Sequence, residues 1–206
     1  MSRYTHSARW YDTISAEPIY RVGRERAIAA LRLREGSRVL DIGCGTGLNF
    51  PLLLAAIGPS GQVVGVDRSS QMLAVAQRKT IHLPPGNVVL VEADAEQLDP
   101  ATLGLDGPGA AFDAVLFAYS LSLMSNREQA WLRASALVRA GGRAAIVDMQ
   151  APHGWGRLLD APARFACLLG GADINAHPWT LLEGAATDIQ SWSLRGGHVQ
   201  VRVGTL

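Results

Sequence analysis

The stretch from Val39 to Gly47, Val-Leu-Asp-Ile-Gly-Cys-Gly-Thr-Gly, constrains this chain more than any other feature. Its first half is a short apolar run with branched side chains, which is typical of a buried strand over 38–42. Three glycines at alternate positions follow, and glycine lets backbone approach a ligand with no Cβ in the way. A helix is predicted over 48–57. Because the first N–H groups of a helix lack intrahelical partners, the unit offers donors to a ligand.

Two kinds of nucleotide-like ligand are held by such a loop. The dinucleotide fingerprint Gly-x-Gly-x-x-Gly would place its third glycine at position 48, which is Leu48. Here the third glycine comes one residue early, at Gly47, and Asp41 stands near the end of the preceding strand. An NAD-linked reductase is therefore the weaker alternative.

Strands and helices alternate along the rest of the chain. After the first unit, apolar runs predict strands, and a helix is expected over 127–139 before Gly141-Gly142. The last part of the chain alternates in period two around Arg195-Gly196-Gly197, which indicates a hairpin. The predicted strands are 38–42, 62–66, 88–91, 112–117, 143–149, 188–194 and 198–203.

The segment Asp41-Ile-Gly-Cys-Gly-Thr-Gly resembles motif I of the class I S-adenosylmethionine (SAM)-dependent methyltransferases. The resemblance implies SAM as methyl donor and S-adenosylhomocysteine (SAH) as product. It also implies an α/β fold with a Rossmann-like, doubly wound, seven-stranded sheet. That sheet would be mostly parallel, with a C-terminal antiparallel hairpin and helices on both faces.

Asp67 is the predicted ribose ligand. It follows the second strand and lies 20 residues beyond Gly47, the spacing of an acidic residue that accepts hydrogen bonds from a ribose. The alternative is that Asp67 caps the next helix, which Ser69 or Ser70 could do equally well. In an open parallel sheet, ligands bind beyond the carboxyl ends of the strands, where Asp67 and the glycine loop meet.

The family resemblance implies further donor contacts. Asp94 would accept from the adenine amino group, the N–H of Ala95 would donate to the ring, and Met72 would touch the adenine. An aromatic residue of the N-terminal segment would close over the donor, with Trp10, Tyr11 and Arg24 as a lid. The complete predicted donor set is Tyr11, Asp41, Gly43, Cys44, Gly45, Gly47, Asp67, Arg68, Met72, Asp94, Ala95 and Phe117.

The predicted catalytic residues are His153, Asp148 and Tyr119. Methyl transfer mainly needs alignment and a dry cavity, and a base is required only for a hydroxyl or a protonated amine. His153 follows the fifth strand and is the first choice as base, with a solvent-exposed loop histidine as the alternative. His198 borders the hairpin turn and is expected to be structural or exposed.

A divalent metal is not predicted, although it stays open as an alternative. Oxygen and nitrogen ligands could come from four side chains near the end of the sheet. Their spacing does not resemble a compact zinc motif. The four are Asp148, His153, Asp173 and His177.

The acceptor is expected to be a small molecule methylated on oxygen or nitrogen, with a sugar or glycolipid hydroxyl as first choice. Trp155, Trp179 and Trp192 could stack on a sugar face, or could belong to the core. The alternatives are N- or C-methylation of a phospholipid head group or a quinone. A non-catalytic scaffold that only binds the donor is the alternative of another class.

Composition sets the remaining expectations. The chain has 206 residues and a net charge of +1, which argues for one domain and against a nucleic-acid partner. We divide that domain into an N-terminal lid and helix (1–35), a cofactor-binding core (36–150) and a substrate cap with the hairpin (151–206). With two cysteines and no apolar run of membrane-spanning length, a cytoplasmic protein is expected. Transient membrane contact and a homodimer stay open.

Overall fold

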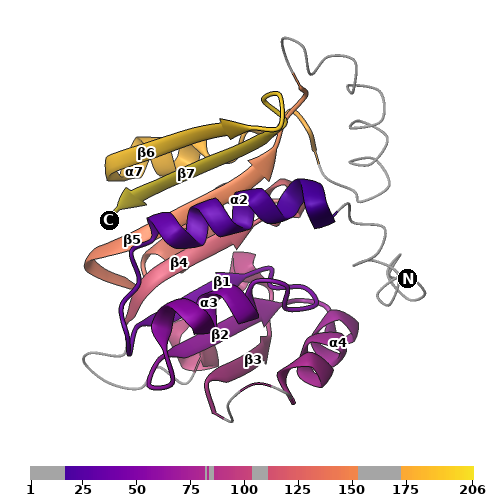
Figure 1. Ribbon diagram of the computed structural model, residues 1–206, viewed down its shortest axis with the longest axis vertical. Helices are drawn as coiled ribbons and strands as arrows, with labels where there is room; N and C mark the ends of the chain where they lie inside the picture. The colour runs from indigo at the N-terminus through magenta and orange to yellow at the C-terminus, as the bar shows by residue number, and fades with distance from the viewer. Residues whose placement is uncertain (1–16, 82, 84–85, 104–110, 153–172) are drawn as a thin grey trace.

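The computed structural model describes residues 17–206, except 82, 84–85, 104–110 and 153–172. One seven-stranded sheet runs through it in the order β3-β2-β1-β4-β5-β7-β6 (Figure 1). Neighbouring strands from β3 to β5 are parallel, and β7 is antiparallel to both β5 and β6. This architecture confirms the predicted fold class. The strands are β1 (Arg38–Ile42), β2 (Gln62–Asp67), β3 (Val88–Glu92), β4 (Phe112–Ala118), β5 (Val138–Met149), β6 (Thr187–Leu194) and β7 (Val199–Thr205).

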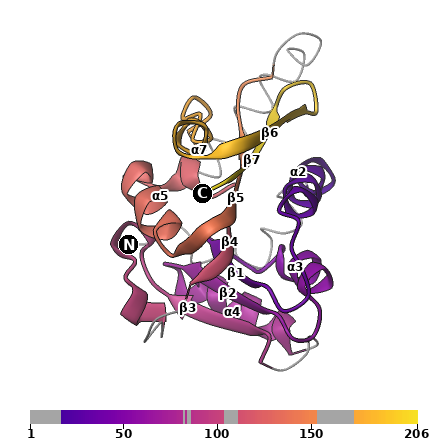
Figure 2. The same cartoon turned by 90° about the vertical axis from the view of Figure 1, so that its left-hand side faces the viewer.

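Helices cover both faces of the sheet. Figure 2 shows α2 (Glu17–Ala30) and α3 (Phe50–Ile57) on one side, with α5 (Arg127–Ser135) and α7 (Thr180–Ala185) on the other. The helix α4 (Ser70–Thr80) packs through Leu73 and Ala76 into the same cluster as α2 and α3. Short 3-10 turns follow β3 and β4: η1 (Ala95–Gln97), η2 (Pro100–Leu103) and η3 (Leu121–Leu123).

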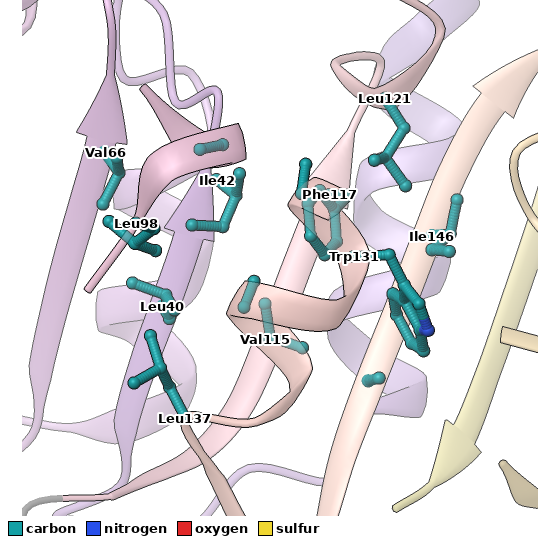
Figure 3. Close-up of a cluster of buried hydrophobic side chains, with 14 of the residues drawn as sticks. Leu40, Ile42, Val66, Leu98, Val115, Phe117, Leu121, Trp131, Leu137 and Ile146 are labelled. Atoms are coloured by element: carbon teal, nitrogen blue, oxygen red, sulfur yellow. The ribbon is translucent and has the colours of Figure 1, made fainter. Parts of the chain in front are cut away.

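Two hydrophobic clusters sandwich the sheet, and their division follows the alternation of side chains along each strand. In β1, Leu40 and Ile42 face the α5 side, where they join Phe117 and Trp131 (Figure 3). Val39 faces the α2 and α3 side. Because β1 is covered on both faces, it appears in the sequence as a nearly continuous apolar run.

Six of the seven strand predictions agree with the structure to within two residues, but the strand predicted over 143–149 begins five residues earlier, at Val138. Two helix predictions also need correction. The helix predicted over 48–57 begins at Phe50, because residues 45–49 remain in turns. The helix predicted over 127–139 ends at Ser135. The Gly141-Gly142 pair, which indicated a helix end, lies instead inside β5, where the pairing register with β4 shifts.

The topology places the ends of β1, β2 and β4 side by side. The chain leaves β1 toward β2 and β3, then crosses back to β4 on the other side of β1. A reversal of this kind opens the crevice where α/β proteins bind ligands. The division into one domain stays a prediction, as do the cytoplasmic location and the homodimer. No helix among the described residues is long and apolar enough to cross a bilayer.

Candidate functional site

The glycine loop adopts a backbone that only glycine tolerates well. Gly43, Gly45 and Gly47 have φ of +68°, +55° and +77°, in the left-handed region that L side chains rarely adopt. A Cβ at Gly47 would lie 2.6 Å from the ring of Phe50, whereas one at Gly45 would meet no atom of the described residues within 4 Å. The loop is therefore packed from below at Gly47 and open above Gly45.

The start of the loop is tied to both neighbouring strands. The N–H groups of Gly43 and Cys44 donate to the Val66 carbonyl at the end of β2, at 2.8 and 3.0 Å. On the other side, the buried Ser120 hydroxyl after β4 donates to the Ile42 carbonyl at 2.8 Å. These bonds fix the loop between the two strands that border the crevice.

Asp67 lies against this loop, as the spacing predicts. Its Oδ2 accepts from the Gly45 N–H at 2.8 Å, and its Oδ1 accepts from the Ser69 N–H at 2.9 Å. Burial raises the pKa of this carboxyl, and the two backbone donors partly oppose the rise. Ser69, rather than Asp67, caps α4, by accepting from the Met72 N–H. Each carboxylate oxygen has further acceptor capacity for a ligand hydroxyl.

Asp41 lies beneath the loop and is fully buried. The Asn49 side-chain amide donates to both of its oxygens, at 3.0 and 3.1 Å. Burial raises the pKa of Asp41 to about 7, with a smaller contribution from the negative charge of Asp67; Asn49 and Arg24 lower it. Asn49 precedes α3 without capping it through its side chain, and its NH2 group is turned toward Asp41 instead. The Asn49 Oδ1 is buried and has no hydrogen-bond partner among the described residues.

The predicted adenine contacts lie at the ends of β2 and β3. Asp94 accepts from the Glu96 N–H at 2.9 Å, so it caps η1, and Ala95 is buried next to it. Met72 is buried on the first turn of α4. Arg68 is exposed, and its charge lowers the pKa of Asp67. Their contacts with adenine stay predictions.

Two members of the predicted donor set point into the protein. The Phe117 side chain is enclosed in the core, with its ring centroid 6.0 Å from that of Trp131 (Figure 3). Cys44 is buried, and burial raises the pKa of its thiol. A neutral buried thiol packs as a small apolar group and is a poor nucleophile. Only their backbone lies at the crevice, that of Phe117 near the end of β4 and that of Cys44 in the glycine loop.

Tyr119 follows β4 in a left-handed conformation, with φ of +58°. Its hydroxyl donates to the Tyr20 carbonyl on α2 at 2.7 Å, and the two rings lie 5.0 Å apart. The Arg24 guanidinium lies 5.8 Å from the centre of the Tyr119 ring. A left-handed conformation costs a bulky residue free energy and is found mostly where surrounding contacts enforce it.

Asp148, the last residue but one of β5, is fully buried. Its Oδ1 accepts from the Ser122 hydroxyl at 2.8 Å, and its Oδ2 accepts from the Ser122 N–H at 3.1 Å. Burial raises its pKa to about 6, while the Ser122 bonds and the charge of Arg127 lower it. In this arrangement Asp148 holds η3 onto β5, and it has no open face toward an acceptor.

A small aromatic and apolar cluster, which the sequence did not predict, lies at the carboxyl edge of β4 and β5. Met149 and Ile174 are buried there against Tyr20, Tyr119 and Ala151. Next to it, the ring of His198 lies 5.8 Å from that of Tyr20. No local pattern brings these residues together, because they come from α2, the ends of β4 and β5, the loop before α7 and the residue before β7. We call the group of Tyr20, Tyr119, Met149, Ala151 and Ile174 the edge cluster.

Some predicted residues lie outside the described part of the chain. These are Tyr11 and His153, together with Trp10 and Trp155. Among the residues that are described, no three His, Cys, Asp or Glu side chains converge as a metal site would require. Of the alternative metal ligands, Asp148 is engaged by Ser122, and Asp173 lies 3.9 Å from Arg127.

The loop and its neighbours fit the nucleoside of SAM. The open space above Gly45 admits a ligand close to the backbone, and the Asp67 carboxylate stands directly beside it. A carboxylate suits a ribose because it accepts from two hydroxyls at once. Leu48 and the early Gly47 depart from the dinucleotide fingerprint at this same loop.

Comparison with known proteins gives a family and a fold. Residues 39–142 match the family model described as a methyltransferase domain. A ubiquinone/menaquinone biosynthesis C-methyltransferase of Pseudomonas savastanoi is 33% identical over 135 residues, 65% of this chain and 50% of that protein. A demethylmenaquinone methyltransferase of Listeria monocytogenes is 28% identical over 144 residues, 69% of this chain and 58% of that one. The match thus covers only 50% and 58% of the length of these two curated relatives.

A solved structure extends the likeness in fold to nearly the whole chain. A SAM-dependent methyltransferase from Aquifex aeolicus superimposes with a TM-score of 0.68 at 18% identity, covering 96% of both chains. At this identity the superposition bears on the fold alone. It agrees with the seven-stranded sheet and its antiparallel C-terminal strands.

The packing beneath the glycine loop predicts unequal effects for two glycine substitutions. Gly47→Ala and Gly141→Ala each place a Cβ on left-handed backbone (φ +77° and +73°), but only the first meets an aromatic ring at 2.6 Å. Left-handed backbone costs an L residue about 1–2 kcal/mol, and overpacking adds about 1–3 kcal/mol. Urea unfolding should show the larger loss of stability for Gly47→Ala. Equal losses would mean that the loop moves freely away from Phe50.

The raised pKa of Asp148 predicts a pH dependence of stability. Because its pKa rises from 3.8 to about 6 on folding, the folded state favours the protonated carboxyl. Its stabilising contribution is complete below pH 3.8 and is lost as the pH rises through 6. At about 1.36 kcal/mol per pKa unit, the change is on the order of 3 kcal/mol.

Asp148→Asn removes this titration while keeping an oxygen that can accept from Ser122. The unfolding free energy of the wild type minus that of the variant should fall between pH 4 and pH 7, measured by denaturant titration at each pH. A difference that is flat or rises with pH would contradict the buried, raised carboxyl.

Proposed function

The chain belongs to the methyltransferase domain family, and we propose that it transfers a methyl group from SAM to a ring carbon of a hydroxylated, quinol-type small molecule. The observation that supports the donor most strongly is the Gly45 N–H bonded to Asp67 beside open space in the loop. The acceptor class is supported by the quinone methyltransferases among the relatives and by the edge cluster.

The donor half of the site is formed by residues already held in place. When bound, SAM supplies a methyl group activated by the positive charge on its sulfur. Asp67 accepts from the ribose hydroxyls, and the loop backbone at Gly45 lies against the nucleoside. Ser120 and Val66 keep the loop from shifting when the ligand enters. Alignment of this kind is the main contribution an enzyme makes to a displacement at an activated carbon.

The acceptor half is assigned to the carboxyl edge of β4 and β5. The edge cluster offers aromatic surface from the half-buried Tyr20 and Tyr119, which pack on the buried Met149. Such surface suits a planar ring, since aromatic pairs gain free energy beyond the area they bury. The named relatives are a ubiquinone/menaquinone biosynthesis C-methyltransferase and a demethylmenaquinone methyltransferase, and a quinol-type acceptor is carried over to this chain as part of the proposal.

The two tryptophans that the structure describes, Trp179 and Trp192, give no support to a sugar acceptor, and Trp155 lies outside the described residues. Trp179 is only 5% exposed, and its ring stacks on His177 at 5.0 Å. Trp192 lies on β6 beneath the Arg26 guanidinium, which is 5.4 Å from its ring centre. Trp179 therefore has no open face for a sugar, and Arg26 covers one face of the half-buried Trp192.

Methylation of a quinol and binding through Asp67 can be tested together. Wild-type protein with SAM and demethylmenaquinol should give a product one methyl group heavier by mass spectrometry, whereas a glycolipid acceptor should give none. Asp67→Asn should weaken SAH binding at least about tenfold in calorimetry, since hydrogen bonds to charged groups contribute about 1.5–3 kcal/mol.

A matched control is Asp99→Asn, which should leave SAH affinity unchanged. Asp99 is exposed and, like Asp67, accepts from the N–H two residues on, that of Ala101, at 2.7 Å. SAH binding without turnover of either acceptor would favour the non-catalytic scaffold. Absence of SAH binding would reject the donor assignment itself.

A further inference from the structure

Tyr20 and His198 form a hydrogen-bonded pair across 178 residues of chain. The Tyr20 hydroxyl lies 3.2 Å from His198 Nε2, and His198 Nδ1 lies 2.6 Å from the Gln150 carbonyl oxygen. His198 is buried, whereas Tyr20 is half-buried. The pair therefore reaches from the interior toward the outside at the end of the sheet.

The direction of these hydrogen bonds follows from the acceptor at Gln150. A carbonyl oxygen can only accept, so His198 Nδ1 carries a hydrogen. In the neutral ring the other nitrogen, Nε2, is then an acceptor. The Tyr20 hydroxyl consequently donates to Nε2, and the imidazole is oriented to take the phenol proton. When a histidine activates a hydroxyl, its ring is commonly oriented by a third group bonded to the other ring nitrogen, as the Gln150 carbonyl does here.

The pair lies at the edge where the proposed acceptor binds. His198 precedes β7, whose first residue pairs with Met149 at the carboxyl end of β5. Tyr20 packs into the edge cluster with Tyr119, which follows β4. The Tyr119 hydroxyl holds the Tyr20 carbonyl at 2.7 Å, so Tyr20 is fixed by both its backbone and its hydroxyl.

We infer that Tyr20, backed by His198, is the base that deprotonates the ring hydroxyl of the acceptor, an inference that rests on the proposed function. A ring carbon becomes nucleophilic when the neighbouring hydroxyl loses its proton. The acceptor proton passes to the Tyr20 oxygen as the Tyr20 proton passes to His198 Nε2, which leaves an imidazolium. The ring carbon then bonds to the methyl group while the carbon–sulfur bond breaks and its electron pair stays on sulfur. The hydrogen on that carbon leaves as a proton to solvent, and the ring hydroxyl is restored when the proton held on His198 returns through Tyr20.

The surroundings of the pair suit this transfer. From α2, the Arg24 guanidinium lies over the Tyr119 ring and contributes positive charge near the phenols. The Tyr119 hydroxyl, from the residue after β4, donates to the Tyr20 carbonyl. The Gln150 carbonyl, from the residue after β5, lies against the His198 ring at Nδ1. The Arg195 carbonyl, from the hairpin turn, accepts from the backbone N–H of His198 at 3.3 Å. The Gln150 carbonyl accepts from the imidazole at Nδ1 and orients the ring, whereas the Arg195 carbonyl fixes the backbone of His198.

Two substitutions separate the proton transfer from packing. Tyr20→Phe keeps the ring in the edge cluster and removes the hydroxyl. His198→Asn keeps a side-chain donor near the Gln150 carbonyl and removes the Nε2 acceptor. Each should lower kcat for a quinol at least about a hundredfold, the usual contribution of a positioned base. SAH affinity should not change, and the limb of the kcat–pH profile that reports the base should disappear.

A probe of ionisation gives a second readout that does not need turnover. Nitrohydroquinone, whose phenolate absorbs visible light, should ionise at lower pH in the ternary complex of the wild type with SAH than in solution. Tyr20→Phe should abolish that shift. Thr187→Val is the matched control, since it removes a hydroxyl that bonds to the Thr205 carbonyl at the opposite end of the sheet. It should leave both kcat and the ionisation unchanged.

The outcomes distinguish this inference from the proposed function. Undiminished kcat in Tyr20→Phe, or equal ionisation of the probe by wild type and Tyr20→Phe, overturns the base assignment. Probe ionisation that depends on Tyr20, without methyl transfer to any quinol, supports the base assignment and rejects the proposed function.

Discussion

The hydrogen bond from the Gly45 N–H to the Asp67 carboxylate, at 2.8 Å, is the contact on which the rest of the site depends. It joins the loop after β1 to the end of β2, and it can form only because those strands are parallel and in register, with Ile42 opposite Val66. The loop must also adopt left-handed backbone three times, which restricts these positions to glycine. Sheet pairing, loop sequence and the acidic residue therefore act together.

The segment after β4 contributes equally to the crevice. Three polar side chains there bond to three different elements: Tyr119 to α2, Ser120 to β1 and Ser122 to β5. Burial raises the pKa of Asp41 to about 7 and that of Asp148 to about 6, which marks this edge as poorly solvated. In such surroundings hydrogen bonds and charges act more strongly than in water. A proton-accepting pair at the same edge benefits from that environment.

Much of this arrangement could be predicted from the sequence, because it depends on short-range patterns. Strands buried on both faces appear as apolar runs, and the glycine loop with Asp67 has a fixed spacing. The predicted end of α5 was wrong because a Gly-Gly pair is typical both of a helix end and of an irregularity in a strand, and Gly141-Gly142 lies at such an irregularity in β5. Tyr20 and His198 could not be found this way. They are 178 residues apart, and only the antiparallel return of β7 beside β5 brings His198 to the edge.

The most direct measurement is a crystal structure of the chain with SAH bound. The account predicts the two ribose hydroxyls within hydrogen-bond distance of the Asp67 carboxylate and the nucleoside against the backbone at Gly45. It also predicts that the sulfur points toward Tyr20 and the edge cluster. A nucleoside bound elsewhere, or a sulfur directed away from the carboxyl edge of β4 and β5, would contradict the site as a whole.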